Sequence, residues 1–184
     1  MIRGRTIALR PIRESDLDAL LEIENDHDRR GPWVIHRLTA RPAFEKEFRE
    51  TGFLTADSGK LLIVDAEDRL LGNIGFFKPA HYMDALELGY QIFDTAQRGR
   101  GVTTEAVRLL VDWLFGVKKI GRLQLGIVPE NVPSRRVAEK SGFQYEGLLR
   151  SAVYLDGVSR DLEIWGLLRR EWEERRRGEH SRVK

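Results

Sequence analysis

The chain has 184 residues, of which 41% are hydrophobic and 33% charged, so it can fill a real core and is not expected to be disordered. It contains no cysteine, which excludes disulfides, thiolate zinc sites and a cysteine nucleophile. A formal net charge of +2 is too small to indicate a nucleic-acid-binding surface. The sequence shows neither the long apolar run of a membrane span nor a signal peptide, so we expect a cytoplasmic protein of one domain that binds no membrane.

The first segments predict a short strand and a helix. Residues 6–10 favour a strand that ends at Pro11. A helix is expected to follow from about residue 14, with Ser15 as its N-cap and Asp18 at its positive end.

A polar connection joins this helix to a second one. Residues 25–31 predict a turn, and after it we expect Trp33 in the core and His36 on the solvated surface. The second helix is expected to begin near Pro42, which suits a first helical position, and to stop by Gly52.

Three strands are expected next. Residues 61–64 and 70–77 predict two of them, joined by the polar turn at 66–69. Residues 86–92 alternate between apolar and other side chains, which indicates a third strand at the centre of the chain.

A glycine-rich turn, 97–101, then leads into a helix whose apolar stripe runs over residues 102–117. The first amides of a helix have no internal partner and carry partial positive charge, while glycines let a ligand approach the backbone closely. With Arg98 and Arg100 beside it, the turn predicts a cradle for phosphate or diphosphate, although a solvated surface connection remains the alternative. Neither the P-loop pattern nor the third glycine of the dinucleotide fingerprint is present.

The second half of the chain extends the expected sheet. Residues 122–128 predict a strand, and the helical crossover before it normally makes such a strand the parallel neighbour of 86–92. A short helix that ends at Gly142 follows. Residues 144–155 and 159–168 suggest a hairpin around the turn dipeptide Asp156-Gly157.

The tail, residues 169–184, mixes arginines with glutamates. We expect it to start as a helix and then to fray into a charged, solvated end.

Two motifs resemble a known family. Residues 98–103, RGRGVT, resemble the Q/R-x-x-G-x-G/A diphosphate loop of the GNAT superfamily of N-acetyltransferases, with Thr103 in place of the last Gly or Ala. Asn131, Ser134 and the run EKSGF at 139–143 are similar to the N-x-x-S…E-K-x-G-F signature of the Rim-type branch. Members of this branch acetylate N-terminal amines of ribosomal proteins or amines of small molecules. The resemblance covers about residues 6–168.

The resemblance implies a fold and a cosubstrate. The fold is a single-domain α/β (α+β) GNAT fold over residues 1–184, with a core at 6–168 and a mixed central sheet flanked by helices, in which a parallel strand pair is splayed. Acetyl-CoA lies with its pantetheine arm in that opening, no metal takes part, and the protein is a monomer or a homodimer. The residues that the resemblance assigns to acetyl-CoA are Ile92, Phe93, Arg98, Gly99, Arg100, Gly101, Val102, Thr103, Asn131 and Ser134.

The reaction implied is direct transfer of acetyl from the thioester to a primary amine, either of a protein N-terminus or of a small molecule. Such a transfer needs a base for the amine, a donor for the thioester oxygen and a proton for the leaving sulfur. Glu87 is the first candidate for the base, Glu163 the second and His81 the third. The other interpretation of Glu87 is that it lies on the solvated face of the sheet. The oxygen donor is expected to be a backbone amide near Ile92.

The acid is less obvious, because the tyrosine that many GNAT enzymes use aligns with Ala138. Ser134 is the replacement expected in the Rim-type branch, and its other role is to cap the helix after Pro133. The acidic side chains between residues 14 and 28 could attract a cationic acceptor.

Two further functions compete with acetyl transfer. One is an acyl-CoA-binding module that acts as a sensor or partner and does not turn over, which the missing tyrosine and Thr103 permit. The other is a protein that binds a different nucleotide or phosphate through the same loop.

Overall fold

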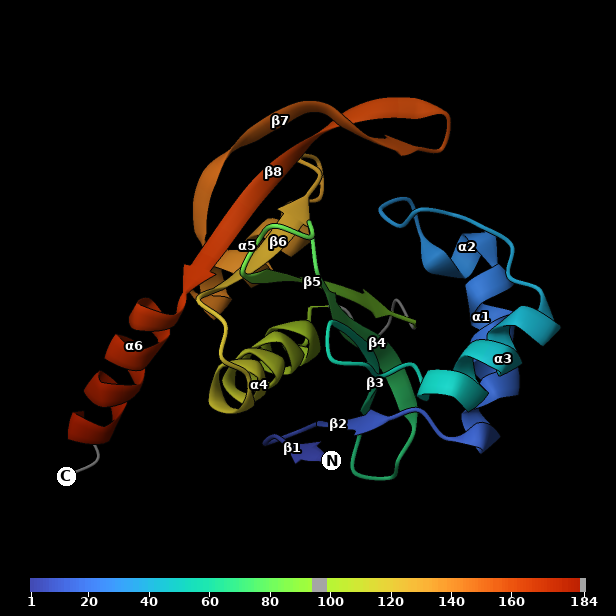
Figure 1. The fold of residues 1–184 in the computed structure, drawn as a ribbon, viewed down its shortest axis with the longest axis horizontal. Helices are drawn as coiled ribbons and strands as arrows, with labels where there is room; N and C mark the ends of the chain where they lie inside the picture. The colour runs from blue at the N-terminus through green and yellow to red at the C-terminus, as the bar shows by residue number, and fades with distance from the viewer. Residues whose placement is uncertain (94–98, 183–184) are drawn as a thin grey trace.

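A mixed sheet of eight strands runs through the computed structural model, which describes residues 1–93 and 99–182 (Figure 1). The strand order is β1-β2-β3-β4-β5-β6-β8-β7, and every neighbouring pair is antiparallel except β5 and β6. The strands are β1 Ile2–Arg3, β2 Ala8–Pro11, β3 Ser58–Val64, β4 Leu70–Phe77, β5 Ala85–Ile92, β6 Arg122–Ile127, β7 Gln144–Leu155 and β8 Val158–Leu168.

Helices cover both faces of this sheet. They are the 3₁₀ turn η1 Glu14–Asp16, α1 Leu17–Asn25, α2 His27–Arg30, α3 Arg41–Thr51, α4 Val102–Val117, α5 Val132–Ser141 and α6 Arg169–Arg182. The alternation of β3 assigns the two faces: Leu61 and Ile63 pack into the core under α4, whereas Leu62 and Val64 pack into a second core under α1 and α3. The expected fold class is therefore confirmed.

The parallel pair is splayed, as expected. β5 and β6 are in register only where residues 85–87 face residues 122–124. Beyond that point β5 stays paired with β4 as far as Ile92, and β6 stays paired with β8 as far as Ile127. The facing edges of β5 and β6 therefore lack regular pairing with each other from residue 88 onward.

The last two strands form a long hairpin that arches over one end of the sheet toward α2 (Figure 1). Its two-residue turn has positive φ at both Asp156 (+48°) and Gly157 (+79°), which is the geometry that the Asp-Gly dipeptide predicts. The register of β7 on β8 shifts between Leu149 and Val153, and such irregularities bend a strand.

Most of the expected elements are confirmed, and α4 has the bounds that its apolar stripe predicts. The N-cap assigned to Ser15 is wrong: Ser15 lies inside η1, whose N-cap is Arg13, and Asp16 closes a capping box there by accepting a hydrogen bond from the Arg13 amide at 2.7 Å. Residues 27–30, expected in a turn, form α2.

The tail is helical as far as Arg182, and it is not merely solvated. Trp172 packs on Phe115 with ring centroids 5.3 Å apart. Arg169 donates hydrogen bonds to the carbonyl groups of Phe115, Lys118 and Ile120, which caps the loop after α4. These contacts hold the first turns of α6 against the domain, and they explain why the helix does not fray where the charge pattern alone suggested it would.

Candidate functional site

The start of α4 presents an open backbone. Gly99 and Gly101 have φ angles of +75° and +83°, which favour glycine, and Gly101 is the N-cap of α4. A Cβ built at either position would meet no described atom within 4 Å. Val102 is buried in the core, so only its backbone can reach a ligand, and Arg100 is exposed.

The amides of this turn lack partners in the part of the chain that the structure describes. Among the residues that the structure describes, the amides of residues 99–103 donate no hydrogen bond to another described residue. A helix start with free amides and a backbone exposed by glycine suits an anion. Arg98, which the sequence analysis adds to this cradle, lies outside the described residues.

Along β5, every second residue turns its main-chain amide and carbonyl toward the gap between β5 and β6. The amide of Phe93 donates to the carbonyl of Leu71 on β4 at 3.0 Å, so it is already used. Main-chain groups alternate in direction along an antiparallel strand, so the amide of Ile92 points away from β4 and toward the gap. Of the two positions expected to meet the pantetheine arm, Ile92 therefore has the free amide.

A hydrogen bond spans the gap on the side of α4 and α5. The hydroxyl of Tyr90, on β5, lies 2.7 Å from Oγ of Ser134, near the start of α5. Burial raises the pKa of Tyr90 to about 12, although the bond to Ser134 opposes this shift, so the phenol stays protonated at neutral pH. From the sequence alone, Tyr90 is only part of the apolar alternation of the strand, and nothing in that pattern predicts its bond to Ser134.

Because Asn131 caps α5, the hydroxyl of Ser134 is not needed as the cap. Asn131 is the N-cap of α5, and its Oδ1 accepts a hydrogen bond from the amide of Ser134 at 3.3 Å. The capping role considered for Ser134 thus belongs to Asn131, and the serine hydroxyl is left for Tyr90. Ala138, at the position of the usual tyrosine, is fully buried in the core.

Glu87 lies where β5 and β6 part. Nε2 of Gln124, its neighbour on β6, donates to Oε2 of Glu87 at 2.7 Å. Burial raises the pKa of Glu87 above its ordinary value, although the hydrogen bond from Gln124 lowers it in part. The interpretation of Glu87 as a solvated carboxylate does not fit this burial. Gln124 itself was missed, although the parallel register places it opposite Glu87.

Glu87 and Ser134 lie on opposite faces of the sheet. Leu86, Leu88 and Tyr90 contact the core under α4, so Glu87 points to the side of α1 and α3. A group in the gap between β5 and β6 can be reached from both sides, with a carboxylate on one and a hydroxyl pair on the other.

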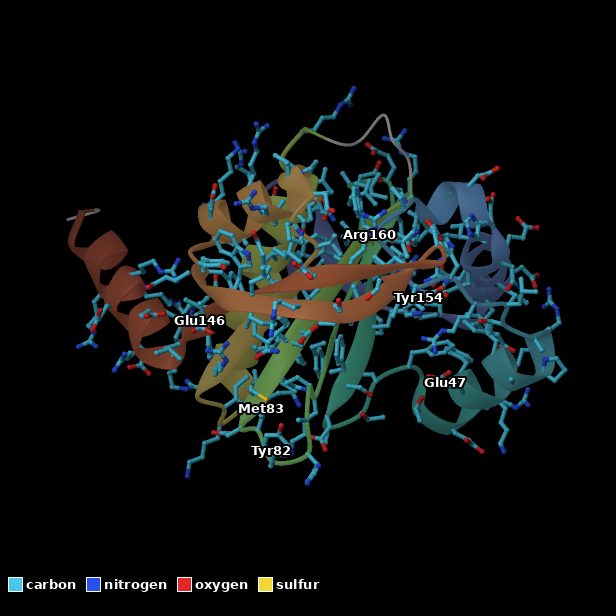
Figure 2. The ribbon with its side chains drawn as sticks, turned by 90° about the horizontal axis from the view of Figure 1, so that it is seen from above. Glu47, Tyr82, Met83, Glu146, Tyr154 and Arg160 are labelled. Atoms are coloured by element: carbon cyan, nitrogen blue, oxygen red, sulfur yellow. The ribbon has the colours of Figure 1, made fainter. Side chains whose placement is uncertain are left out.

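The other candidates for the base are less suitable. Glu163 is buried on the face of α5, where Nε of Arg135 lies 3.2 Å from its Oε2 and the indole of Trp165 donates to the same oxygen at 2.9 Å. Its charge is therefore already balanced by a structural ion pair. His81 is exposed and packs edge-on against Tyr82, which Figure 2 shows at the lower edge of the molecule, away from Tyr154 and Arg160 on the hairpin.

The acidic residues of the first helices are largely used inside the fold. Asp16 is ion-paired with Arg10 at 2.7 Å, and Asp18 with Arg41 at 2.6 Å. Glu24 accepts from Lys60 at 2.7 Å. These carboxylates already have cationic partners, which weakens the expectation that they attract a cationic acceptor.

In the segment after α2, the burial of Trp33 and that of His36 both differ from what the sequence predicts. Trp33 is 37% exposed rather than in the core, and its ring lies 5.8 Å from the guanidinium of Arg160 on the hairpin. His36 is expected to be solvated, yet its side chain is only 14% exposed. Both residues meet the β7–β8 hairpin, which is distant in sequence, so their environment could not be predicted from the neighbouring residues.

The sheet is mixed and contains one splayed parallel pair, and α4 beside it starts at an open glycine turn. This combination defines the fold class of the N-acetyltransferases. Residues 6–144 match the family described as "Acetyltransferase (GNAT) domain", and the chain belongs to this family. Among curated proteins it is similar to "Probable N-acetyltransferase YjcK" of Bacillus subtilis (strain 168), with 29% identity over 91% of this chain and 97% of the relative.

Two solved structures share the fold. One is spermidine N-acetyltransferase from Vibrio cholerae in complex with CoA and spermine, with a TM-score of 0.80 and 17% identity over 92% of this chain and 99% of that one. The other is RimL, a ribosomal L7/L12 alpha-N-protein acetyltransferase in complex with coenzyme A, with a TM-score of 0.77 and 20% identity over 91% and 97% of the two chains. At these identities the likeness supports the fold alone. Among the described helices, none combines the length and the apolar character that a membrane span requires.

Proposed function

We propose that the chain is an acetyl-CoA-dependent N-acetyltransferase of Rim-like type that transfers acetyl directly to a primary amine. The observation that carries this proposal is the edge of β5 that β6 leaves unpaired, beside the amides of residues 99–103, which have no partner among the described residues. The family match and the binding of coenzyme A by the two structural neighbours support it. Acetyl-CoA supplies the acetyl group as a thioester.

The turn before α4 binds the diphosphate in this proposal. The amides of residues 99–103 donate to its oxygens, and Arg100 adds positive charge from the exposed side. Asn131 holds α5 in place through its cap and keeps its amide nitrogen free to donate. The amide of Ile92 faces the gap, where it stabilises the negative charge that develops on the thioester oxygen.

Glu87 accepts the proton of the attacking amine, directly or through water. The raised pKa makes its carboxylate a stronger base than an exposed glutamate. As the new carbon–nitrogen bond forms, the carbon–sulfur bond breaks. Ser134 then donates its proton to the departing sulfur and takes one from Tyr90, with which it shares a 2.7 Å hydrogen bond, and the phenolate of Tyr90 regains its proton from water.

The acceptor is a primary amine of a protein N-terminus or of a small molecule. RimL is described as acting on a protein N-terminus, and the Vibrio cholerae protein as a spermidine acetyltransferase, so relatives of this fold take both kinds. The internal pairing of Asp16, Asp18 and Glu24 does not favour a polycation, so we place N-terminal peptides first.

The proposal is tested by titrating the purified chain with acetyl-CoA and then measuring release of free CoA with a panel of N-terminal peptides, polyamines and other small amines. Saturable binding with turnover on at least one amine is expected. Binding without turnover on the whole panel would favour the non-catalytic module, and absence of acetyl-CoA binding would remove the proposal.

A pair of glycine variants locates the diphosphate site. Gly101→Glu adds a carboxylate among the free amides and is expected to weaken acetyl-CoA binding at least about 100-fold, the worth of about 2.7 kcal/mol. Gly52→Glu is the matched control, because Gly52 also has positive φ (+59°) and open space around it but ends α3, remote from the gap. Each variant carries a similar strain of about 1–2 kcal/mol, so equal losses of binding would show that strain and not the site is responsible.

A further inference from the structure

The tip of the β7–β8 hairpin meets the segment around α2, and three metal-binding side chains converge there. His27 begins α2, His36 lies in the segment after it, and Asp156 is the first residue of the hairpin turn. Nε2 of His27 is 3.7 Å from Oδ1 of Asp156, and Nε2 of His36 is 3.8 Å from the same oxygen. Their ligand atoms all lie within 4.8 Å of one another.

The contacts within this cluster are not ordinary hydrogen bonds. Both nitrogen–oxygen distances exceed the range of about 2.7–3.2 Å for such a bond. The two imidazoles are stacked nearly parallel, with centroids 3.6 Å apart and planes at 20°, an arrangement that aromatic rings do not prefer. The three groups therefore converge on a common space without satisfying one another.

The separations are close to those of ligands around one ion. Zinc binds imidazole nitrogen and carboxylate oxygen at about 2.0–2.2 Å in a tetrahedron, which places neighbouring ligand atoms about 3.3–3.6 Å apart. The observed 3.7 and 3.8 Å are close to that value, and the two imidazoles must turn out of their stack so that the in-plane lone pairs of both rings point at one ion.

The geometry points to a divalent transition-metal site of the Zn²⁺ class, bound by His27, His36 and Asp156, with water in the fourth position. Two imidazoles favour zinc and its neighbours over magnesium or calcium, which take oxygen ligands. The absence of cysteine excludes thiolate sites but not this donor set. Nε2 of His36 also lies 3.0 Å from the carbonyl of Gly31, so metal binding there replaces a hydrogen bond and requires the tautomer that carries its proton on Nδ1.

Contacts of neighbouring side chains help to hold the two segments in place without a metal. Asp26 caps α2 by accepting from the amide of Arg29 at 3.0 Å, which fixes the start of the helix at His27. The stacking of Trp33 on Arg160 is a second contact between the same two segments. In Figure 2, Arg160 and Tyr154 mark the hairpin end that approaches α2. A bound ion would therefore clamp the hairpin tip to the α2 segment, and this inference does not depend on acetyl transfer.

The test uses the full chain, stripped of metal with a chelator and titrated with Zn²⁺ by calorimetry. One ion per chain is expected to bind, and His27→Ala and Asp156→Asn are each expected to weaken binding more than about 100-fold, since changes even outside the ligand set cost 10–100-fold. Asparagine tolerates the positive φ of Asp156, so this variant keeps the turn. His81→Ala and Asp57→Asn, exposed residues of the same types elsewhere, are controls expected to bind within about twofold of the parent.

Hydrogen exchange locates the ion independently of affinity. Zn²⁺ is expected to slow the exchange of amides in residues 26–38 and 151–160 of the parent chain and to leave them unchanged in Asp156→Asn. Absence of saturable binding would overturn the site. So would binding that His27→Ala and Asp156→Asn leave intact, because the ion would then be held elsewhere.

Discussion

Replacing Glu87 by glutamine separates its chemistry from its structure. The two side chains have the same shape, and Gln124 can still donate to the oxygen of the new amide, so the fold should be retained. The variant lacks a group that can accept the amine proton. A positioned base contributes about 10²- to 10⁴-fold, or about 2.7–5.4 kcal/mol of the barrier, and we expect the turnover number to fall by that factor.

The same substitution is expected to stabilise the protein. Burial raises the pKa of Glu87, so the folded state binds a proton more tightly than the unfolded chain does. Stability therefore falls as the pH rises from the unfolded pKa through the folded one, and at neutral pH the ionised Glu87 is a cost to folding. The glutamine variant avoids this cost, and its midpoint of thermal unfolding at pH 7 should be at or above that of the parent.

The assays are the release of free CoA across pH and thermal unfolding at pH 7. In the parent, kcat/KM should rise with pH as Glu87 loses its proton, and the residual activity of the variant should lack this limb. Glu47→Gln, an exposed carboxylate on α3 that Figure 2 shows far from the gap, is the control and should change neither quantity. Unchanged turnover in Glu87→Gln at every pH would refute the assignment of the base.

Two further predictions concern the hydroxyl pair and a buried ion pair. Tyr90→Phe removes the partner of Ser134, so kcat should fall about 10- to 100-fold, the worth of one hydrogen bond to a charged group, while the affinity for acetyl-CoA measured by calorimetry stays the same. An equal loss in affinity would show that Tyr90 only shapes the site. Asp16→Asn leaves the buried Arg10 with Asp68 alone, so we expect a loss of about 3 kcal/mol and a fall of about 6–12 °C in the unfolding midpoint. Burial raises the pKa of Asp16, but its hydrogen bonds to Arg10 and Arg13 lower the pKa more, so the net shift is downward. The ion pair therefore stabilises the fold above the pKa of the unfolded chain. This stabilisation is lost as the pH falls through the pKa of the folded state. Urea titrations at neutral and acidic pH should therefore show the difference between parent and variant shrinking in acid, and a difference that persists would contradict the role of the ion pair.

Local sequence patterns were sufficient to predict much of the fold. The apolar stripe of α4 fixes both of its ends, because each turn of the helix must bury the same face. The Asp156-Gly157 dipeptide predicts its hairpin, because only a turn with positive φ at both residues matches the twist of the strands. Glu87 and Ser134 remain predictions, Glu87 from its place on the central strand and Ser134 from the motif that resembles the Rim-type branch.

The contacts between the candidate site residues were not predictable in the same way. Tyr90 reaches Ser134 only because α5 packs on the face of β5 where Tyr90 points, and the alternation of the strand does not reveal which helix will cover that face. His36 and Trp33 were misjudged because the hairpin tip that contacts them comes from the other end of the chain. Tertiary contacts of this kind decide burial, whereas sequence patterns report mainly the local element.

A crystal structure of the chain with coenzyme A would test the account most directly. We expect the diphosphate on the amides of residues 99–103 and the pantetheine arm between β5 and β6, bonded to the main chain at Ile92. Coenzyme A bound elsewhere, or β5 and β6 paired along their full length in its presence, would contradict the account.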